Sequence, residues 1–268
     1  MLTVLAHGTF GHRALDDWSF DPITMLVATA LIVSYVNGWH PRRDGTRRAM
    51  AFGGGVVTGL VAVVSPIHVA AEESLSWHMA QHVMLIGVCA PLIALAAPAA
   101  ALQRGLGRRI AGLTRRARRR SGMSADRMRR FRSPLARWLV FVVVFWGWHT
   151  TRLYTAAVRH ETVHALEHVT FVAAALLVWS TVLGPSRAAG NADPIMRVLV
   201  VFLLGLQGVL LSVLMVFSRQ PWYPVYESGP GDPLADQHLA GALMWIPLGV
   251  LYAATGIWAV MALIGPDD

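Results

Sequence analysis

Apolar stretches of about twenty residues recur along the whole chain, and they constrain the fold more than any other feature. A helix of this length crosses about 30 Å of hydrocarbon. We therefore expect an all-α, polytopic membrane protein built as a bundle of about seven transmembrane helices. The expected spans are approximately residues 22–38, 50–70, 76–102, 134–151, 161–183, 195–217 and 238–264.

The composition excludes an ordinary soluble globular protein. Of 268 residues, 55% are hydrophobic and 14% charged, whereas a soluble domain carries roughly 25% charged residues. We expect one transmembrane helical domain over residues 1–268, with an outer N-terminal tail at 1–21 and an arginine-rich cytoplasmic loop at 104–133. The single cysteine, Cys89, excludes an internal disulfide and any Cys-x-x-Cys site.

The arginines predict how the chain is oriented. All 23 basic residues are arginine, and most follow the first, third and fifth stretches. By the positive-inside rule the N-terminus lies outside and the C-terminus in the cytoplasm. The net charge of +8 therefore reflects topology and contact with lipid headgroups, and we expect no nucleic-acid partner. Only Arg13, Arg152, Arg159 and Arg219 fall on the outer side.

Histidines gather on the outer side of this topology. Two pairs, His78/His82 and His164/His168, have i,i+4 spacing, so each pair projects from one helical face. His149 closes the fourth stretch and His238 opens the seventh. Because imidazole suits copper, zinc, iron and nickel, these six residues form a candidate metal site. We interpret His40, His68 and His160 as packing residues.

Other side chains near this layer are candidate auxiliary groups. The thioethers of Met79 and Met244 would favour Cu(I), although methionine in an apolar helix is usually core filler. Asp236 would either orient an imidazole or cap the seventh helix. Cys89 would be either a deeper copper station or a plain buried thiol.

Two metalloprotease patterns overlap at one histidine. His160-Glu161-x-x-His164 matches H-E-x-x-H, and His164-x-x-Glu167-His168 matches H-x-x-E-H. An intramembrane zinc metalloprotease is therefore an alternative, although both patterns cannot serve one zinc ion in the usual way. A haem clamped by two histidines and a copper transporter are further alternatives.

Four motifs occur in order along the chain. They are His78-Met79-Ala80-Gln81-His82 with Ala90-Pro91-Leu92, Trp148-His149 with Leu153-Tyr154, His164-Ala165-Leu166-Glu167-His168 with Phe171 and Trp179, and Asp236-Gln237 through Met244-Trp245 and Pro247. Through these motifs the chain resembles the membrane-integral cytochrome c oxidase assembly factor CtaG of bacteria. His7, His12 and His68 match none of these motifs.

The resemblance implies a multi-pass protein of the bacterial cytoplasmic membrane with a non-enzymatic role. Such a protein would bind copper, with Cu(I) favoured over zinc or haem, and deliver it on the outer face. Its partners would be cytochrome c oxidase subunits and an extracytoplasmic copper carrier. The residues that the resemblance marks as important are His78, His82, His149, His164, His168, Asp236 and Met244, with Glu167 and Tyr154 inside the same motifs.

Overall fold

The computed structural model describes residues 18–107, 112, 116, 133–185, 192–227 and 231–264. Within these ranges every regular element is helical, which confirms the all-α class. Most of the N-terminal tail, with His7 and His12, and most of the arginine-rich loop lie outside the described residues.

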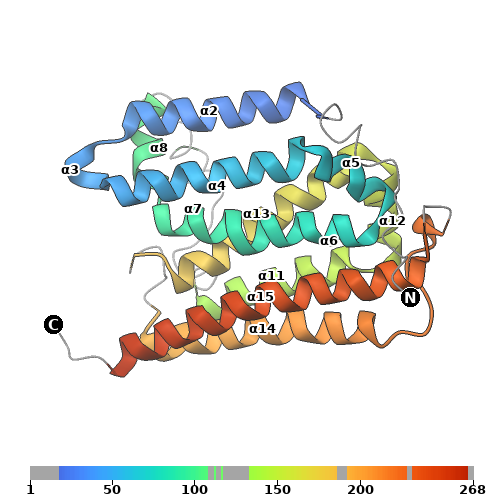
Figure 1. Cartoon of the computed structure of the whole chain (residues 1–268). Helices are drawn as coiled ribbons and strands as arrows, with labels where there is room; N and C mark the ends of the chain where they lie inside the picture. The colour runs from blue at the N-terminus through green and yellow to red at the C-terminus, as the bar shows by residue number, and fades with distance from the viewer. Residues whose placement is uncertain are drawn as a thin grey trace, which may run out of the picture.

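The helices form an elongated bundle whose long members run side by side (Figure 1). A π-helical turn, η1 (Leu85–Cys89), joins α6 to α7, and a 3-10 turn, η2 (Pro224–Tyr226), precedes the last helix. The α-helices are α2 (Pro22–Gly38), α3 (Pro41–Asp44), α4 (Thr46–Val64), α5 (Pro66–Glu73), α6 (Leu75–Met84), α7 (Ala90–Ala96), α8 (Ala99–Gly105), α11 (Pro134–Trp148), α12 (Thr151–Arg159), α13 (Glu161–Val182), α14 (Pro194–Val216) and α15 (Pro233–Ile264).

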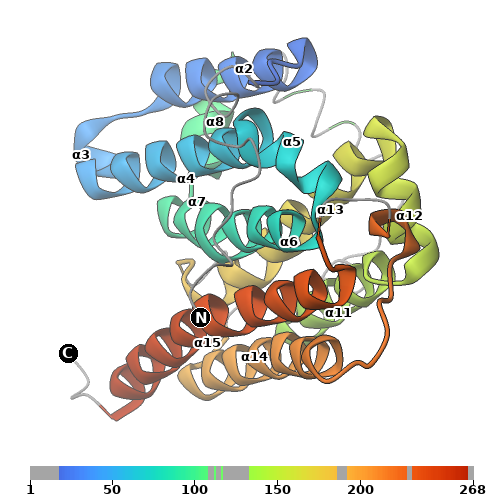
Figure 2. The ribbon, with the colours of Figure 1, turned by 45° about the vertical axis from the view of Figure 1, so that its right-hand side comes forward.

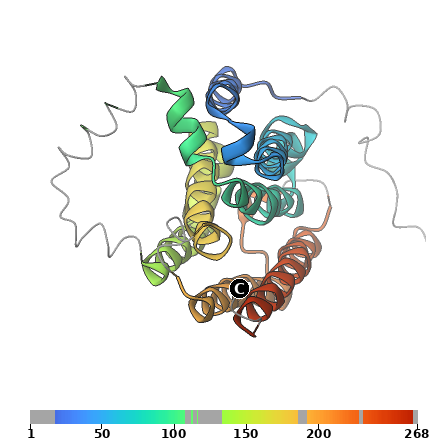
Figure 3. The same cartoon turned by 90° about the vertical axis from the view of Figure 1, so that its left-hand side faces the viewer.

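The continuous segment α6–η1–α7 lies at the centre of the bundle. Helices α4 and α13 pack against α7 and η1, and α15 packs against α6. Helix α11 packs against both α13 and α14, and α14 packs against α15. The view down the bundle shows these helices around the centre, with α2 at the periphery (Figure 3). The central segment is therefore where polar side chains are best shielded.

Among the described residues, five helical segments are long and apolar enough to cross a membrane: α4, the continuous segment Leu75–Ala96, α13, α14 and α15. Helices α2 and α11 are apolar but have 17 and 15 residues. At 1.5 Å per residue they are about 25 and 22 Å long, less than the hydrocarbon thickness. The structure thus bears out a polytopic chain with several candidate spans.

Several helix ends differ from the expected spans because of local capping. The second stretch breaks at Ser65, whose side chain accepts a hydrogen bond from Ile67 N, and Pro66 starts α5. The third stretch breaks at Ala97, which has a left-handed backbone (φ 46°) just before Pro98. The seventh helix starts earlier than expected, at Pro233.

The fourth stretch also ends early, at Trp148. There the hydroxyl of Thr150 donates to the backbone oxygen of Gly147 (2.7 Å), and Tyr223 Oη donates to that of His149 (2.9 Å). These bonds satisfy carbonyls that a continuing helix would use. The chain turns, and α12 lies at the same end of the bundle as α5 (Figure 2).

Two glycines allow α2 and α8 to touch through their backbones. A Cβ at Gly38 would lie 1.9 Å from the backbone oxygen of Ala101, and one at Gly105 would lie 1.7 Å from that of Ser34. Arg104 Nε donates to the Gly38 oxygen at the same contact (2.8 Å). Any larger residue at either glycine would force the helices apart.

Candidate metal centre

Five titratable side chains from α6 and α13 meet inside the bundle. Helix α6 contributes His78 and His82, and α13 contributes His164, Glu167 and His168. None is more than 7% exposed. Spacings of three and four residues put each group on one face of its helix, so the two faces meet where the helices lie close. We call these five residues the His/Glu cluster.

Glu167 lies between the two histidine pairs. Its Oε2 is 3.4 Å from His78 Nε2, and its Oε1 is 3.7 Å from His82 Nε2. Both distances exceed the usual 2.7–3.2 Å of an N–H···O hydrogen bond. The carboxylate therefore faces the imidazole nitrogens without being bound tightly by them.

The ligand atoms of the cluster fall into two triads. One consists of His78, His82 and Glu167, and the other of His164, Glu167 and His168. Within each triad the ligand atoms lie within 4.8 Å of one another. Either triad could contract around a metal ion, because bonds of about 2.0–2.2 Å place neighbouring ligands about 3–4 Å apart.

Many polar atoms of the cluster have no hydrogen-bond partner. Leaving such groups buried is costly, by about 1–3 kcal/mol for each neutral group and more for a charge. A cation bound among them would use the lone pairs of the imidazoles and balance the carboxylate, so the donor set fits a metal ion. The unpartnered atoms are His78 Nε2, both ring nitrogens of His82, His164 Nε2, His168 Nε2 and both carboxylate oxygens of Glu167.

His149 adds a fifth buried imidazole beside the α6 pair. Its ring centroid is 6.1 Å from that of His82. Its Nδ1 lies 2.7 Å from the backbone oxygen of Phe145. Because a carbonyl oxygen can only accept, Nδ1 carries the hydrogen and donates it. That assignment leaves the lone pair on Nε2, which has no partner. The structure therefore brings the predicted ligand His149 to the edge of the cluster.

Two tyrosines orient the ring of His78. Tyr226 Oη donates to the backbone oxygen of Ala71 (3.0 Å) and lies 3.3 Å from His78 Nδ1. Because the Tyr226 hydroxyl hydrogen is donated to Ala71, its oxygen accepts a hydrogen bond from His78 Nδ1–H. His78 then carries its lone pair on Nε2, which faces Glu167. Burial raises the pKa of Tyr226, so it stays protonated. Tyr154, expected from its motif, packs on the His78 ring and has its Oη 3.1 Å from Tyr226 Oη.

His68 lies against the cluster as a packed, hydrogen-bonded ring, which agrees with its interpretation as a packing residue. Its ring stacks on His164 with a centroid separation of 5.2 Å and meets His168 edge to face at 6.4 Å. Gln81 Nε2 donates to His68 Nδ1 (3.1 Å) and to the backbone oxygen of Ala62 (2.6 Å). The signal in the sequence was the break at Ser65-Pro66, which turns α5 and its histidine over the cluster.

Four other candidates lie apart from the two triads. His238 Nε2 is 3.0 Å from the backbone oxygen of Ser218, so this ring is engaged at the end of α14. Met79 and Met244 are buried in the main hydrophobic core. The thiol of Cys89 faces α4, where a Cβ added at Gly59 would lie 3.2 Å from Sγ.

Asp236 neither orients an imidazole of the cluster nor caps its own helix. Its carboxylate accepts hydrogen bonds from Ser74 Oγ (3.0 Å), Leu75 N (2.7 Å) and Ser76 N (3.3 Å). These donors surround the N-terminus of α6, where backbone N–H groups and the helix dipole favour a negative charge. Asp236 therefore fixes α15 to the start of the helix that carries His78 and His82.

The protease patterns differ in where their residues lie. His160 is the exposed residue that precedes α13, and Glu161 is exposed in its first turn. The H-x-x-E-H pattern instead coincides with the triad of His164, Glu167 and His168. In that triad the glutamate faces two further imidazoles. The geometry therefore leaves the second pattern as the one that could hold zinc.

The packing of the histidine rings disfavours a haem between α6 and α13. The rings of His78 and His164 stack with their centroids 4.9 Å apart, and those of His82 and His168 meet edge to face at 5.7 Å. Axial ligands approach a porphyrin from opposite faces along the iron–nitrogen bonds. Rings already in contact leave no room for a macrocycle between them.

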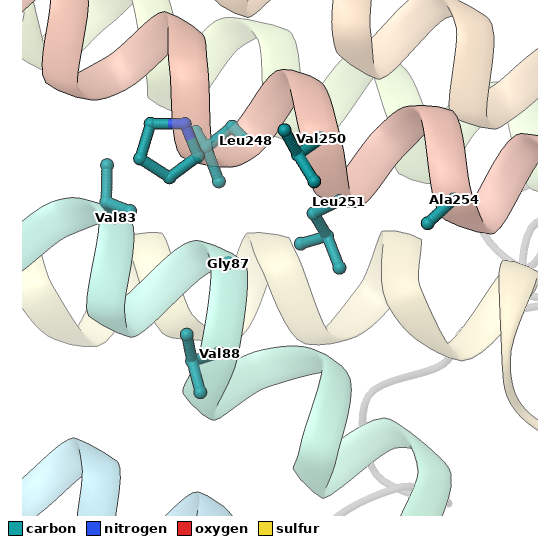
Figure 4. A pocket seen from close by; sticks show the side chains of 8 residues that line it. Val83, Gly87, Val88, Leu248, Val250, Leu251 and Ala254 are labelled. Carbon is teal, nitrogen blue, oxygen red and sulfur yellow. The ribbon is translucent and has the colours of Figure 1, made fainter.

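An apolar groove lies at the contact between α6, η1 and α15 (Figure 4). It is lined by residues such as Val83, Gly87, Val88, Pro247 and Leu251. None of its lining residues is titratable or a metal ligand. The groove therefore offers a ligand only apolar contacts.

A family model described as cytochrome c oxidase caa3 assembly factor (Caa3_CtaG) matches residues 31–265. That range includes the whole His/Glu cluster and all the candidate spans. Neither a curated protein nor a solved structure matches the chain. The match spans well over half of the sequence, and the chain belongs to the family of cytochrome c oxidase caa3 assembly factors.

Proposed function

We propose that this chain is a non-enzymatic assembly factor that binds copper in the His/Glu cluster and delivers it to cytochrome c oxidase. The observation that carries the proposal is the set of buried imidazole and carboxylate atoms without hydrogen-bond partners. Family membership supplies the client, a cytochrome c oxidase. We infer that delivery involves oxidase subunits and a copper carrier outside the cytoplasmic membrane of a bacterium.

Copper is the ion that the donors and the client together favour. Imidazole suits copper and zinc equally well, and a carboxylate is compatible with either ion. Each Cu(I) ion brings less positive charge into the apolar interior than a divalent ion would, and Glu167 is the one carboxylate of the cluster that balances it. We therefore favour Cu(I), with zinc as the alternative.

We further propose seven spans with the cluster toward the outer side. The arginine-bearing elements α3 and α8 lie at one end of the bundle, and α5 and α12 lie at the other (Figure 1). The cluster histidines come from the parts of α6 and α13 that begin at the α5 end. The positive-inside rule assigns the arginine end to the cytoplasm, with α2 and α11 completing the seven spans. Copper would then enter and leave on the outer side.

The remaining alternatives make different demands on the same residues. A zinc metalloprotease needs Glu167 as a general base and retains its metal when that base is removed. A chaperone needs the imidazoles and has no turnover. A transporter would need a further station toward the cytoplasmic end, and Cys89 faces α4 instead of the cluster.

The experiment that tests the proposal is elemental analysis with an absorption spectrum of the detergent-purified full chain. Wild type is compared, after exposure to copper, with a variant carrying His78→Ala, His82→Ala, His164→Ala and His168→Ala. The matched control carries His40→Ala and His160→Ala, because both residues are exposed and lie outside the cluster. Circular dichroism and gel filtration verify that each variant folds.

Copper bound to wild type and to the control, and lost from the cluster variant, is the expected result. A Soret band in wild type would show that the bound group is haem instead of copper. Zinc lost from the cluster variant, accompanied by proteolysis that depends on Glu167, would favour the protease. Wild-type protein that takes up no metal would contradict the proposal, leaving the cluster as a packing or proton-carrying network.

A further inference from the structure

We propose that the His/Glu cluster holds two copper ions side by side, with Glu167 as the bridging ligand. This inference rests on the proposed copper binding and adds its stoichiometry and arrangement. One ion would lie in the triad of His78, His82 and Glu167, and the other in the triad of His164, Glu167 and His168.

The division of the ligand atoms carries the inference. Each i,i+4 pair can direct two imidazoles of its own helix at one ion. The two pairs meet the same carboxylate from different helices, and the atoms of each triad lie within 4.8 Å. A carboxylate offers two oxygens with about four lone-pair sites, so it can serve two ions at once.

The position of Glu167 puts its carboxylate within reach of both pairs. Its two oxygens face the α6 pair, at 3.4 Å from His78 Nε2 and 3.7 Å from His82 Nε2, and one of them lies within 4.8 Å of the ligand atoms of His164 and His168. The residue is fully buried, and neither oxygen has a hydrogen-bond partner. A buried carboxylate in this situation is strongly unfavourable unless positive charge lies beside it.

The charge balance favours two monovalent ions over two divalent ones. With one carboxylate, two Cu(I) ions leave a net charge of +1 in the cluster, whereas two divalent ions leave +3. His149 stands beside the α6 triad with its Nε2 unpartnered, so that triad has a fourth donor within reach. Hydrogen bonds from Leu75 N and Ser76 N to the Asp236 carboxylate fix the start of the helix that carries that pair.

The test is a copper titration of the full chain in detergent under anaerobic conditions, with Cu(I) as the probe. Copper per chain is measured by elemental analysis, and X-ray absorption at the copper edge reports whether a second copper ion lies near the first. The variants are His78→Ala/His82→Ala, His164→Ala/His168→Ala and Glu167→Gln, with His40→Ala/His160→Ala as the matched control.

We expect about two copper ions per chain in wild type and in the control, with copper–copper scattering. Each pair variant is expected to lose about half of the copper and all of that scattering. Glu167→Gln keeps the shape of the side chain but loses the charge, and it is expected to lose the scattering and at least half of the copper.

A single ion in wild type that either pair variant abolishes would overturn the two-ion arrangement while preserving copper binding. Two ions that remain paired in Glu167→Gln would overturn the bridging role. Wild-type protein that binds no copper would overturn this inference and the proposed function together. Because the wild-type stoichiometry and scattering by themselves show whether two ions lie side by side, the test of the two-ion arrangement stands even where a variant does not fold.

Discussion

Two carboxylates lie beside α6, and their surroundings are opposite. Asp236, half-buried at the start of the helix, accepts hydrogen bonds from Leu75 N, Ser76 N and Ser74 Oγ. Glu167, fully buried one to two turns further along, has two oxygens without a partner. The protein itself supplies donors for the first carboxylate and none, among the described residues, for the second.

This difference separates a structural acid from a ligand. A carboxylate that receives backbone N–H bonds contributes to stability without any further component. One that is buried against imidazoles lowers stability until a cation joins it. The two sites therefore predict opposite effects on folding when each charge is removed.

The largest effect on folding is expected for Asp236→Ala. It leaves the Leu75 and Ser76 N–H groups and the Ser74 hydroxyl without their acceptor, so we expect a loss of about 1–3 kcal/mol in unfolding free energy. Thermal unfolding in detergent measures this loss. Copper per folded chain is expected to stay at the wild-type level. A folded Asp236→Ala protein that lost its copper would instead assign Asp236 to the metal centre.

A smaller change of opposite sign is expected for Glu167→Gln. Without copper, the variant replaces a buried acid that has no hydrogen-bond donors with a neutral amide, so its unfolding free energy should rise by about 1 kcal/mol. With copper present, wild type should gain stability by mass action and the variant should gain less. Glu161→Gln, exposed on the same helix, is the matched control. If copper-free Glu167→Gln were as unstable as Asp236→Ala, the Glu167 side chain would have hydrogen-bond partners within the fold.

The smallest effect is expected for Cys89→Ala. The thiol is buried, so its removal should cost about 1 kcal/mol or less through a small cavity. Because Sγ faces Gly59 on α4, copper content should not change. Elemental analysis beside the wild type checks this. Loss of copper would indicate that Cys89 is a copper ligand on a path through the membrane and would favour the copper transporter.

Much of the fold followed from apolar length alone, because the hydrocarbon thickness fixes how long a spanning helix must be. The helix ends did not follow, since they depend on single residues such as Ser65, Ala97 and Thr150. The fourth stretch illustrates this: the expected span runs to residue 151, but Tyr223 donates to the carbonyl of His149 from a distant loop. No local pattern records such a partner.

The site was predictable where its residues repeat along one helix. The pairs His78/His82 and His164/His168 come together as their spacing suggested. The central place of Glu167 was not predictable, because it depends on how α6 and α13 pack. For His68 the sequence showed only the break at Ser65-Pro66, where α5 begins, and the contact of its ring with the cluster depends on how α5 packs. His238 shows the converse: its position along the sequence matched the layer, but its ring turns to the Ser218 carbonyl.

The π-helical turn η1 places one additional residue in each hydrogen-bonded ring of that turn, between the α-helical segments α6 and α7. One added residue rotates everything beyond it by about 100° around the axis. Trp179 of α13 binds this turn, donating from Nε1 to the backbone oxygen of Ile86 (2.9 Å). The turn thereby changes the angle, around the helix axis, between two faces. One face is that of α6, which carries His78 and His82, and the other is the face of α7 that meets α4. One continuous span can keep its ligands aimed at α13 while its other half is fitted to a different neighbour.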